Sequence, residues 1–233
     1  RVGLALVRGL RRFPSPVLPA PGSSVLLEAG ASHHLLRVVG IAPGECVVLF
    51  DGRGGSCQAL LEGVEGGRAR MAWSAPIDAS PASGFWLLMA VVRPKAFSAA
   101  IRMATEIGVG HIVPVRCERS LSRGEKSGRW TRLAESAAAQ CGRADTPSIH
   151  PALKPAEALA LAATDSGVVL APGALSLEPG TDASALWIGP EGGLTQGELQ
   201  LASSAGWTCA GLGANVLRAE TAAAVGLGLL LCR

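Results

Sequence analysis

Two glycine-rich segments late in the sequence contain the residue types best suited to hold a ligand. They run from Ile188 to Thr195 and from Leu212 to Thr221. Glycine lets a backbone approach a ligand closely and adopt positive φ, so such loops can press against a flat ring or a sugar while offering main-chain donors and acceptors. One such loop is equally well explained as a turn into a helix capped by Thr195. Two of them, each between a strand and a helix, favour a ligand site.

The loops do not match two common nucleotide-binding patterns. The stretch from Gly211 begins like G-x-G-x-x-G but has Val216 in the third glycine position. It also lies too near the C-terminus for the second half of a dinucleotide-binding fold. Neither loop is followed by Gly-Lys-Ser or Gly-Lys-Thr. The sequence therefore disfavours an NAD site and excludes a P-loop.

Composition narrows the classes of protein to which this sequence could belong. The six cysteines form no C-x-x-C pair and no histidines cluster with them, so we expect no metal site and no disulfide framework, but reduced thiols in a cytoplasmic protein. The longest late apolar run, Ala222 to Leu231, is far shorter than the roughly 20 residues needed to span a bilayer. We expect neither a membrane helix nor a secretory signal.

The net charge of +3 is too small to make the whole molecule a polycation. Nucleic-acid binding would have to depend on local concentrations of arginine. These occur at 8–12, 116–123 and 129–143. From charge alone, ordinary solvated faces are the preferred interpretation.

The elements that must position the loops follow from hydrophobic periodicity. Before a Pro, Ser and Ala stretch at 72–84, which we interpret as a linker, short β-type runs separated by glycine-rich turns predict a small antiparallel barrel interrupted by a helix near 32–39. The strands expected there are 25–27, 46–50, 56–61 and 68–73.

After the linker, strands and helices alternate, which predicts a parallel α/β sheet covered on both faces. The expected strands are 86–92, 111–115, 167–171, 185–188 and 208–212, and the expected helices are 96–107, 129–141, 155–163, 195–205 and 221–231. Ligands in such sheets bind beyond the carboxyl ends of the strands, where both glycine-rich loops should lie.

Several ordered segments resemble one family. They are Ala104 to Val109, Glu118 to Ser120, Gln140 to Arg143, Ile188 to Leu194 and Leu217 to Ala222. Together they are similar to the RsmE-type ribosomal RNA uridine-N3 methyltransferases. The sequence from His33 to Val38, then Pro43-Gly44 and Phe50 to Gly52, is similar to the PUA-like RNA-binding barrel of that family.

This resemblance implies a SPOUT-class fold: a PUA-like β-barrel over 1–73, then a methyltransferase domain over 84–233 whose parallel sheet ends in a trefoil knot. It implies S-adenosylmethionine as cofactor, 16S ribosomal RNA or the small ribosomal subunit as partner, and a homodimer. The cofactor-binding residues it implies are Ile188, Gly189, Glu191, Gly192, Gly193, Leu212, Gly213, Val216 and Leu217.

The chemistry of that reaction assigns further roles. Uridine N3 becomes nucleophilic as its proton leaves and negative charge spreads onto O2 and O4. Arg218 is our candidate to stabilise that charge, because a guanidinium stays protonated and offers parallel donors. Glu220 is the candidate proton acceptor, directly or through a water. The alternative is that Arg218 and Glu220 only brace the knot and the final helix, with Glu220 favoured near the positive N-terminus of that helix. The expected phosphate contacts are Arg12, Arg37, Arg119 and Arg143.

Some positions depart from the family pattern. Ala214-Asn215 stands where the family usually has Pro-Arg, which bears on RNA contact more than on the cofactor loops. Two alternatives stay open at this point: another SPOUT activity, such as ribose 2′-O or tRNA-base methylation, and a non-catalytic RNA-binding ribosome-assembly protein.

Overall fold

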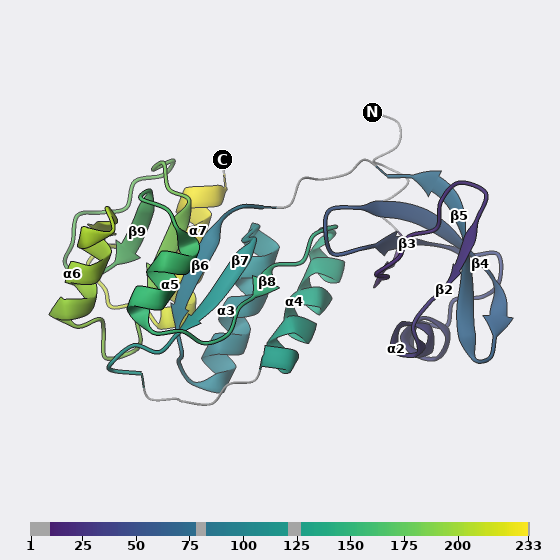
Figure 1. Ribbon diagram of the computed structural model, residues 1–233, viewed down its shortest axis with the longest axis horizontal. Coiled ribbons are helices and arrows are strands. Elements are labelled where there is room, and N and C mark those ends of the chain that lie inside the picture. Colours follow the sequence, from purple (N-terminus) through teal and green to yellow (C-terminus); the bar gives the residue numbers. More distant parts are fainter. Residues whose placement is uncertain (1–9, 78–82, 121–126, 233) are drawn as a thin grey trace. The chain divides into compact units, whose positions relative to one another are not determined.

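A computed structural model describes residues 10–77, 83–120 and 127–232 (Figure 1). Two compact units divide the chain. The first takes in the amino-terminal part together with Ala138–Thr146, and the second runs from Ser83 to Ala137 and resumes at Pro147. Arg8 and Arg123, at the ends of two arginine-rich stretches, lie outside the described residues.

The first unit contains a mixed five-stranded sheet of order β1-β3-β4-β5-β2. Its strands are β1 (Arg12–Pro14), β2 (Ser24–Leu26), β3 (Cys46–Phe50), β4 (Ser56–Glu65) and β5 (Arg68–Pro76). Four of them were expected. The fifth, β1, is too short to show alternation, and it pairs with β3 in parallel, whereas the other neighbours are antiparallel. The sheet is therefore mixed, not antiparallel throughout as expected.

A helix packs on this sheet where one was predicted. Helix α2 (Ala29–His33) continues into a π-helix, η1 (His34–Val39), which ends at Gly40 with a left-handed φ of 75°. Buried Ser32 ties α2 to the sheet: its hydroxyl donates to Leu27 O at 3.1 Å and accepts from Ala69 N at 3.1 Å. The core of this unit is apolar and fully buried, with Phe13, Leu27, Leu35, Val47, Leu49, Leu61 and Met71.

The unit boundaries differ from the expected 1–73 and 84–233. Strand β5 continues to Pro76, into the stretch that we interpreted as a linker. The segment Ala138–Thr146 belongs to the first unit, where Gly54 N donates to Ala144 O at 3.2 Å and Thr146 N to Gly52 O at 2.9 Å. These contacts join residues far apart in the sequence, which periodicity cannot detect.

The second unit is the predicted parallel α/β sheet. Six strands lie in the order β11-β9-β10-β6-β7-β8, and all neighbours are parallel. The elements are β6 (Trp86–Ala90), α3 (Pro94–Ile107), β7 (His111–Val115), α4 (Ser127–Cys141), β8 (Ser148–Ile149), α5 (Pro155–Ala162), β9 (Gly167–Leu170), β10 (Ala185–Ile188), α6 (Gln196–Ser204), β11 (Thr208–Ala210) and α7 (Ala219–Leu231). All the expected helices and strands occur within a few residues of their predicted limits, and the two-residue β8 was not expected.

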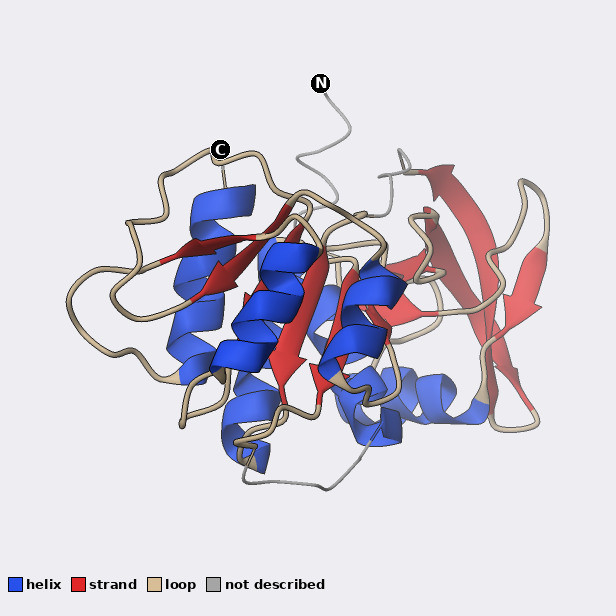
Figure 2. Ribbon diagram, turned by 60° about the vertical axis from the view of Figure 1, so that its left-hand side comes forward, coloured by secondary structure: helices blue, strands red, loops and turns tan. Residues whose placement is uncertain are grey.

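Helices cover both faces of this sheet (Figure 2), so its strands are apolar on both sides. Helices α3 and α7 pack against each other, and so do α5 and α6. Helix α7 lies close to the sheet at Gly226, where a β-carbon would meet side-chain carbons of Leu170 and Leu186 at 3.0 Å. This contact fixes the helix that follows the second glycine-rich loop.

Strand order brings the glycine-rich loops together. Strand β9 lies between β10 and β11, so the carboxyl ends of these three parallel strands share one edge of the sheet. Within the described ranges, no helix is long and apolar enough to cross a membrane. Nor do the residues described bring three His, Cys, Asp or Glu side chains into a metal-binding group.

Candidate functional site

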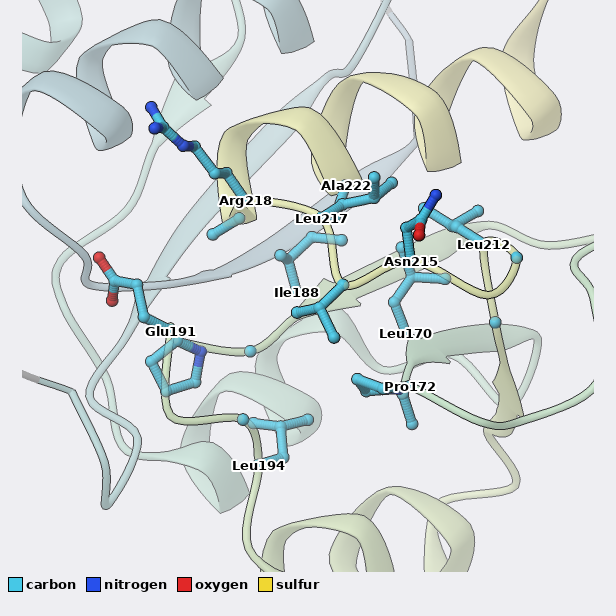
Figure 3. Close-up of a pocket in the computed structure, with 18 of the residues that line it drawn as sticks. Leu170, Pro172, Ile188, Glu191, Leu194, Leu212, Asn215, Leu217, Arg218 and Ala222 are labelled. Atoms are coloured by element: carbon cyan, nitrogen blue, oxygen red, sulfur yellow. The ribbon is translucent and has the colours of Figure 1, made fainter.

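A pocket of about 500 Å³ opens at the carboxyl ends of β9, β10 and β11 (Figure 3). It is lined by Leu170, Ala171, Pro172, Ile188, Gly189, Pro190, Glu191, Gly193, Leu194, Leu199, Gly211, Leu212, Gly213, Asn215, Val216, Leu217, Arg218, Ala219 and Ala222. Most of the lining is aliphatic side chain and glycine backbone. Such a wall suits a ligand with flat apolar parts whose polar edges meet main-chain groups.

The pocket brings together most of the residues predicted from the sequence. Those that line it are Ile188, Gly189, Glu191, Gly193, Leu212, Gly213, Val216, Leu217 and Arg218. Gly192 and Glu220 are not among the lining residues. Gly192 was expected among the cofactor-binding residues, but a β-carbon there would lie 3.2 Å from Arg119 Cβ.

The first loop, from Gly189 to Thr195, is held by bonds at several points. Gly193, with φ 70°, donates its N–H to Pro190 O at 2.8 Å and closes a turn. Thr195 caps α6: its hydroxyl accepts from Glu198 N at 3.3 Å, and Glu198 accepts from Thr195 N at 2.7 Å. This reciprocal pair satisfies two otherwise free donors at the helix start.

The second loop, from Gly211 to Arg218, is anchored mainly at its ends. Gly211 donates to Leu175 O at 2.7 Å and accepts from Leu177 N at 2.8 Å, and a β-carbon on Gly211 would meet Ala174 O at 2.6 Å. At the other end, Arg218 O accepts from Ala222 N at 2.8 Å. Between them the loop projects outward, with Val216 81% exposed.

The third wall of the pocket was missed in the sequence. Leu170 ends β9, Ala171 and Pro172 follow it, and all three line the pocket between the two loops. Their segment has no glycine, so composition gives no signal there. Only the strand order, which places β9 between β10 and β11, shows that this strand end must contribute.

Two charged side chains lie at one end of the pocket. Figure 3 shows Glu191 and Arg218 there, and Asn215 near Leu212 at the opposite end. Arg218 is exposed and occupies the N-cap position of α7, and half-buried Glu220 lies in the first turn of that helix. A carboxylate in a first helical turn is favoured by the helix dipole, which accounts for Glu220 without any catalytic role.

The four predicted phosphate contacts lie in different surroundings. Arg37 is exposed on η1, and exposed Arg119 donates to Gly192 O at 3.0 Å. Arg143 forms two bonds with the buried carboxylate of Asp145, and Arg12 donates to Arg143 O at 3.3 Å while lying over the Phe50 ring. The guanidinium groups of Arg12 and Arg143 therefore already have partners inside the first unit.

Comparison with known proteins gives a consistent family. A family model for the RNA methyltransferase domain matches residues 80–231. The chain is 30% identical over 236 residues to the ribosomal RNA small subunit methyltransferase E of Mycobacterium bovis, covering 93% of this chain and 89% of that protein.

Two solved structures have the same fold. One is the ribosomal RNA small subunit methyltransferase E of Neisseria gonorrhoeae bound to S-adenosylmethionine, with TM-score 0.85 and 28% identity over 94% of this chain and 95% of that one. The other is a methyltransferase from Legionella pneumophila in complex with the same cofactor, with TM-score 0.85 and 26% identity over 96% and 97%. The chain described here belongs to the RNA methyltransferase family that includes the ribosomal RNA small subunit methyltransferases E.

Proposed function

We propose that this protein transfers a methyl group from S-adenosylmethionine to N3 of a uridine in 16S ribosomal RNA. The observation that carries the proposal is the pocket at the ends of β9, β10 and β11, because its glycine backbone and apolar lining suit that cofactor. Its volume of about 500 Å³ is that of a small-molecule site. The relatives from Neisseria gonorrhoeae and Legionella pneumophila bind S-adenosylmethionine.

The two glycine-rich loops are the cofactor-binding residues of this proposal. Ile188, Leu194 and Leu217 would contact the flat adenine and the sugar, and the backbone at Gly189 and Gly213 would approach closely because no side chain intervenes. Gly192 does not line the pocket, so it would contribute to cofactor binding only by allowing the position of the first loop. When bound, the cofactor supplies an electrophilic methyl group on a positively charged sulfur.

We also propose that the carboxyl-terminal part of the sheet forms a trefoil knot of the SPOUT class. The backbone bonds of Gly211 with Leu175 and Leu177 support it, since they hold the segment after β9 against the beginning of the second loop. The first unit would be the PUA-like RNA-binding barrel.

Proton removal and charge stabilisation would take place at the end of the pocket where Arg218 lies. As the proton leaves uridine N3, the new N–C bond forms and the C–S bond to the cofactor breaks, so negative charge on O2 and O4 is transient. The Arg218 guanidinium would stabilise that charge. Glu220, two residues further along α7, would take the proton through a water, because it does not line the pocket itself.

RNA would bind through phosphate contacts from exposed arginines. Arg37 fits this role through its exposure. Arg12, Arg119 and Arg143 would have to contact phosphate while keeping the hydrogen bonds that they already make to other protein groups. A second copy of the chain would complete the base-binding side, giving a homodimer. With a ribosomal substrate, the protein would act in the cytoplasm.

The direct test is the product. Purified protein is incubated with methyl-labelled S-adenosylmethionine and either naked 16S ribosomal RNA or small ribosomal subunits, and the nucleosides are separated by mass spectrometry. We expect label in N3-methyluridine. Label in a 2′-O-methylated nucleoside would replace this proposal with another methyl transfer, and cofactor binding without any labelled RNA would indicate a non-catalytic RNA-binding protein.

A further inference from the structure

The turn that follows β7 contacts the first pocket loop at one point and the first turn of helix α6 at another. Glu118 N donates to Glu198 Oε1 at 2.9 Å, and the guanidinium of Arg119 donates to Gly192 O at 3.0 Å. The turn itself is closed by Ser120 N, which donates to Cys117 O at 3.1 Å. We call residues Cys117–Ser120 the bracing turn. It comes from a part of the chain more than seventy residues before the loop that it contacts.

Glu198 connects the bracing turn to the pocket loop. Its side chain is buried, with 5% of the residue exposed, and its two carboxylate oxygens divide their bonds between the two segments. Oε1 accepts from Glu118, and Oε2 accepts from Thr195 N at 2.7 Å and lies 3.2 Å from Thr195 Oγ1. An ordinary capping carboxylate serves only its own helix. This one also holds a remote backbone N–H.

The Cys117 thiol lies beside the same carboxylate. Burial, together with the negative charge of Glu198, raises the pKa of Cys117 well above its usual range. The thiol therefore stays protonated and uncharged next to Glu198, so the buried carboxylate has no second anion beside it. An uncharged thiol at this place does not repel the Glu198 carboxylate, which can therefore keep its hydrogen bond to the bracing turn.

Gly192 is the point where the bracing turn lies closest to the loop. Its φ is not in the left-handed region, so the backbone conformation does not require glycine. Space is the tighter constraint: a β-carbon would lie 3.2 Å from Arg119 Cβ and 3.5 Å from Arg119 Cδ, so the Arg119 side chain would have to shift slightly. Gly192 is thus explained by the approach of Arg119 from outside the pocket.

We infer that Arg119 and Glu198 are positioning residues for the cofactor site, which they hold through Gly192 and Thr195. This inference rests on the proposed function, because it takes the pocket to be the cofactor site. Neither side chain lines the pocket, but both fix the loop that supplies Gly189, Glu191 and Leu194 to its wall. Arg119, expected from the sequence as a phosphate contact, acts here on the protein's own backbone.

The test separates affinity for the cofactor from folding and from RNA binding. Affinity for S-adenosylhomocysteine is measured by calorimetry for wild type, Arg119→Ala, Arg119→Lys and Gly192→Ala, with thermal unfolding of each. Loss of one charged hydrogen bond should weaken affinity roughly three- to tenfold in Arg119→Ala. Lysine keeps a donor and should restore affinity to within about threefold of wild type. Gly192→Ala should weaken binding although residue 192 does not line the pocket.

A matched control removes the same charge elsewhere in the unit. Arg132 donates to Gly128 O within its own helix, at 3.1 Å, so Arg132→Ala should leave affinity for the cofactor product unchanged. In steady-state assays, Arg119→Ala should raise KM for S-adenosylmethionine while kcat at saturation stays near wild type. Glu198→Gln keeps an acceptor for Glu118 but puts an amide N–H₂ against Thr195 N, and should weaken both affinity and thermal stability.

Each outcome decides between specific claims. If wild type does not bind S-adenosylhomocysteine, the proposed function fails and the inference fails with it. If wild type binds and Arg119→Ala binds equally well, only the inference is overturned. A fall in RNA affinity and salt dependence in Arg119→Ala, with cofactor affinity unchanged, would return Arg119 to the role of a phosphate contact.

Discussion

The two loops that line the pocket are both rich in glycine, but they are held very differently. Gly189–Thr195 is braced by Arg119 and Glu198 and closed by its own turn. In the second loop, the four residues from Gly213 to Val216 are exposed, and within the described parts of the chain they have no hydrogen-bond partner. One wall is therefore preformed, whereas the other lacks hydrogen bonds that would hold it in place. Preformed walls lower the entropic cost of binding, whereas open ones permit entry and release.

The largest expected effect concerns the chemistry at the end of the open loop. Arg218→Ala should lower turnover by roughly a hundredfold or more while affinity for S-adenosylhomocysteine stays near wild type, because the guanidinium would act on charge that exists only in the transition state. Glu220→Gln should act similarly if Glu220 accepts the proton. Single-turnover methylation and calorimetry measure the two quantities separately. If both fall together, or neither does, these residues are scaffold.

The next effect distinguishes the reasons for glycine in the two loops. Gly213 has φ 92° and open space where a β-carbon would lie, so its constraint is conformational, unlike that of Gly192. Gly213→Val should weaken cofactor affinity about tenfold, because a β-branched residue strains this conformation by about 1–3 kcal/mol. Gly213→Asn is the matched control, since asparagine tolerates positive φ better. Equal losses in the two variants would show that space, not conformation, selects glycine there.

A smaller effect is expected at the opposite edge of the sheet, where His111 and His150 lie 3.3 Å apart between ring nitrogens, with Trp86 stacked on His111. Burial lowers the pKa of both imidazoles, and for His150 the neighbouring His111 lowers it further. The folded state therefore binds fewer protons than the unfolded state. Their contribution to stability is complete above the ordinary pKa of about 6.5 and is lost as the pH falls from there through the lowered values.

The His111–His150 pair serves as a control, because its protonation should change stability without changing the two pocket loops. Tm should fall as the pH drops from 7 towards 5, and His150→Gln should flatten that slope. Affinity for S-adenosylhomocysteine at pH 6 should stay within about twofold of the value at neutral pH, because the pair is remote from the pocket. An unchanged slope in His150→Gln would assign the acid sensitivity to other groups.

The smallest effect is expected for RNA contacts outside the pocket. Arg37→Ala should weaken RNA binding modestly and reduce the salt dependence by about 0.7 to 0.9 in the log–log slope, the value of one lost phosphate contact. Arg12→Ala should instead lower stability, because that side chain is engaged with Arg143 O and Phe50. Filter binding across a salt series, with thermal unfolding alongside, measures both. Salt-independent RNA binding by wild type would contradict the model.

The sequence predicted the elements well, because long apolar runs and alternating periodicity are local. It could not give the order of the strands, which depends on contacts between distant segments, and so it missed the wall formed by Leu170–Pro172. Glycine content located both loops correctly. The reason for Gly192 could not be read from composition, because the side chain that it accommodates, Arg119, is distant in sequence.

The sequence also could not show which arginines have partners within the folded protein. Charge identified Arg143 as a candidate phosphate contact, but its partner Asp145 forms two bonds with it in the folded chain. Two residues of separation do not by themselves indicate an ion pair. Burial of Asp145 against the first unit makes the pair structural.

The central claim is that one pocket holds S-adenosylmethionine between a braced loop and an open one. Amide hydrogen exchange with and without S-adenosylhomocysteine tests it most directly. We expect Gly189–Thr195 to be protected already in the free protein and to change little, and 212–217 to exchange rapidly when free and to become strongly protected when the ligand is added. Equal protection of both loops in the free protein, or no change at 212–217 on saturation with ligand, would contradict the account.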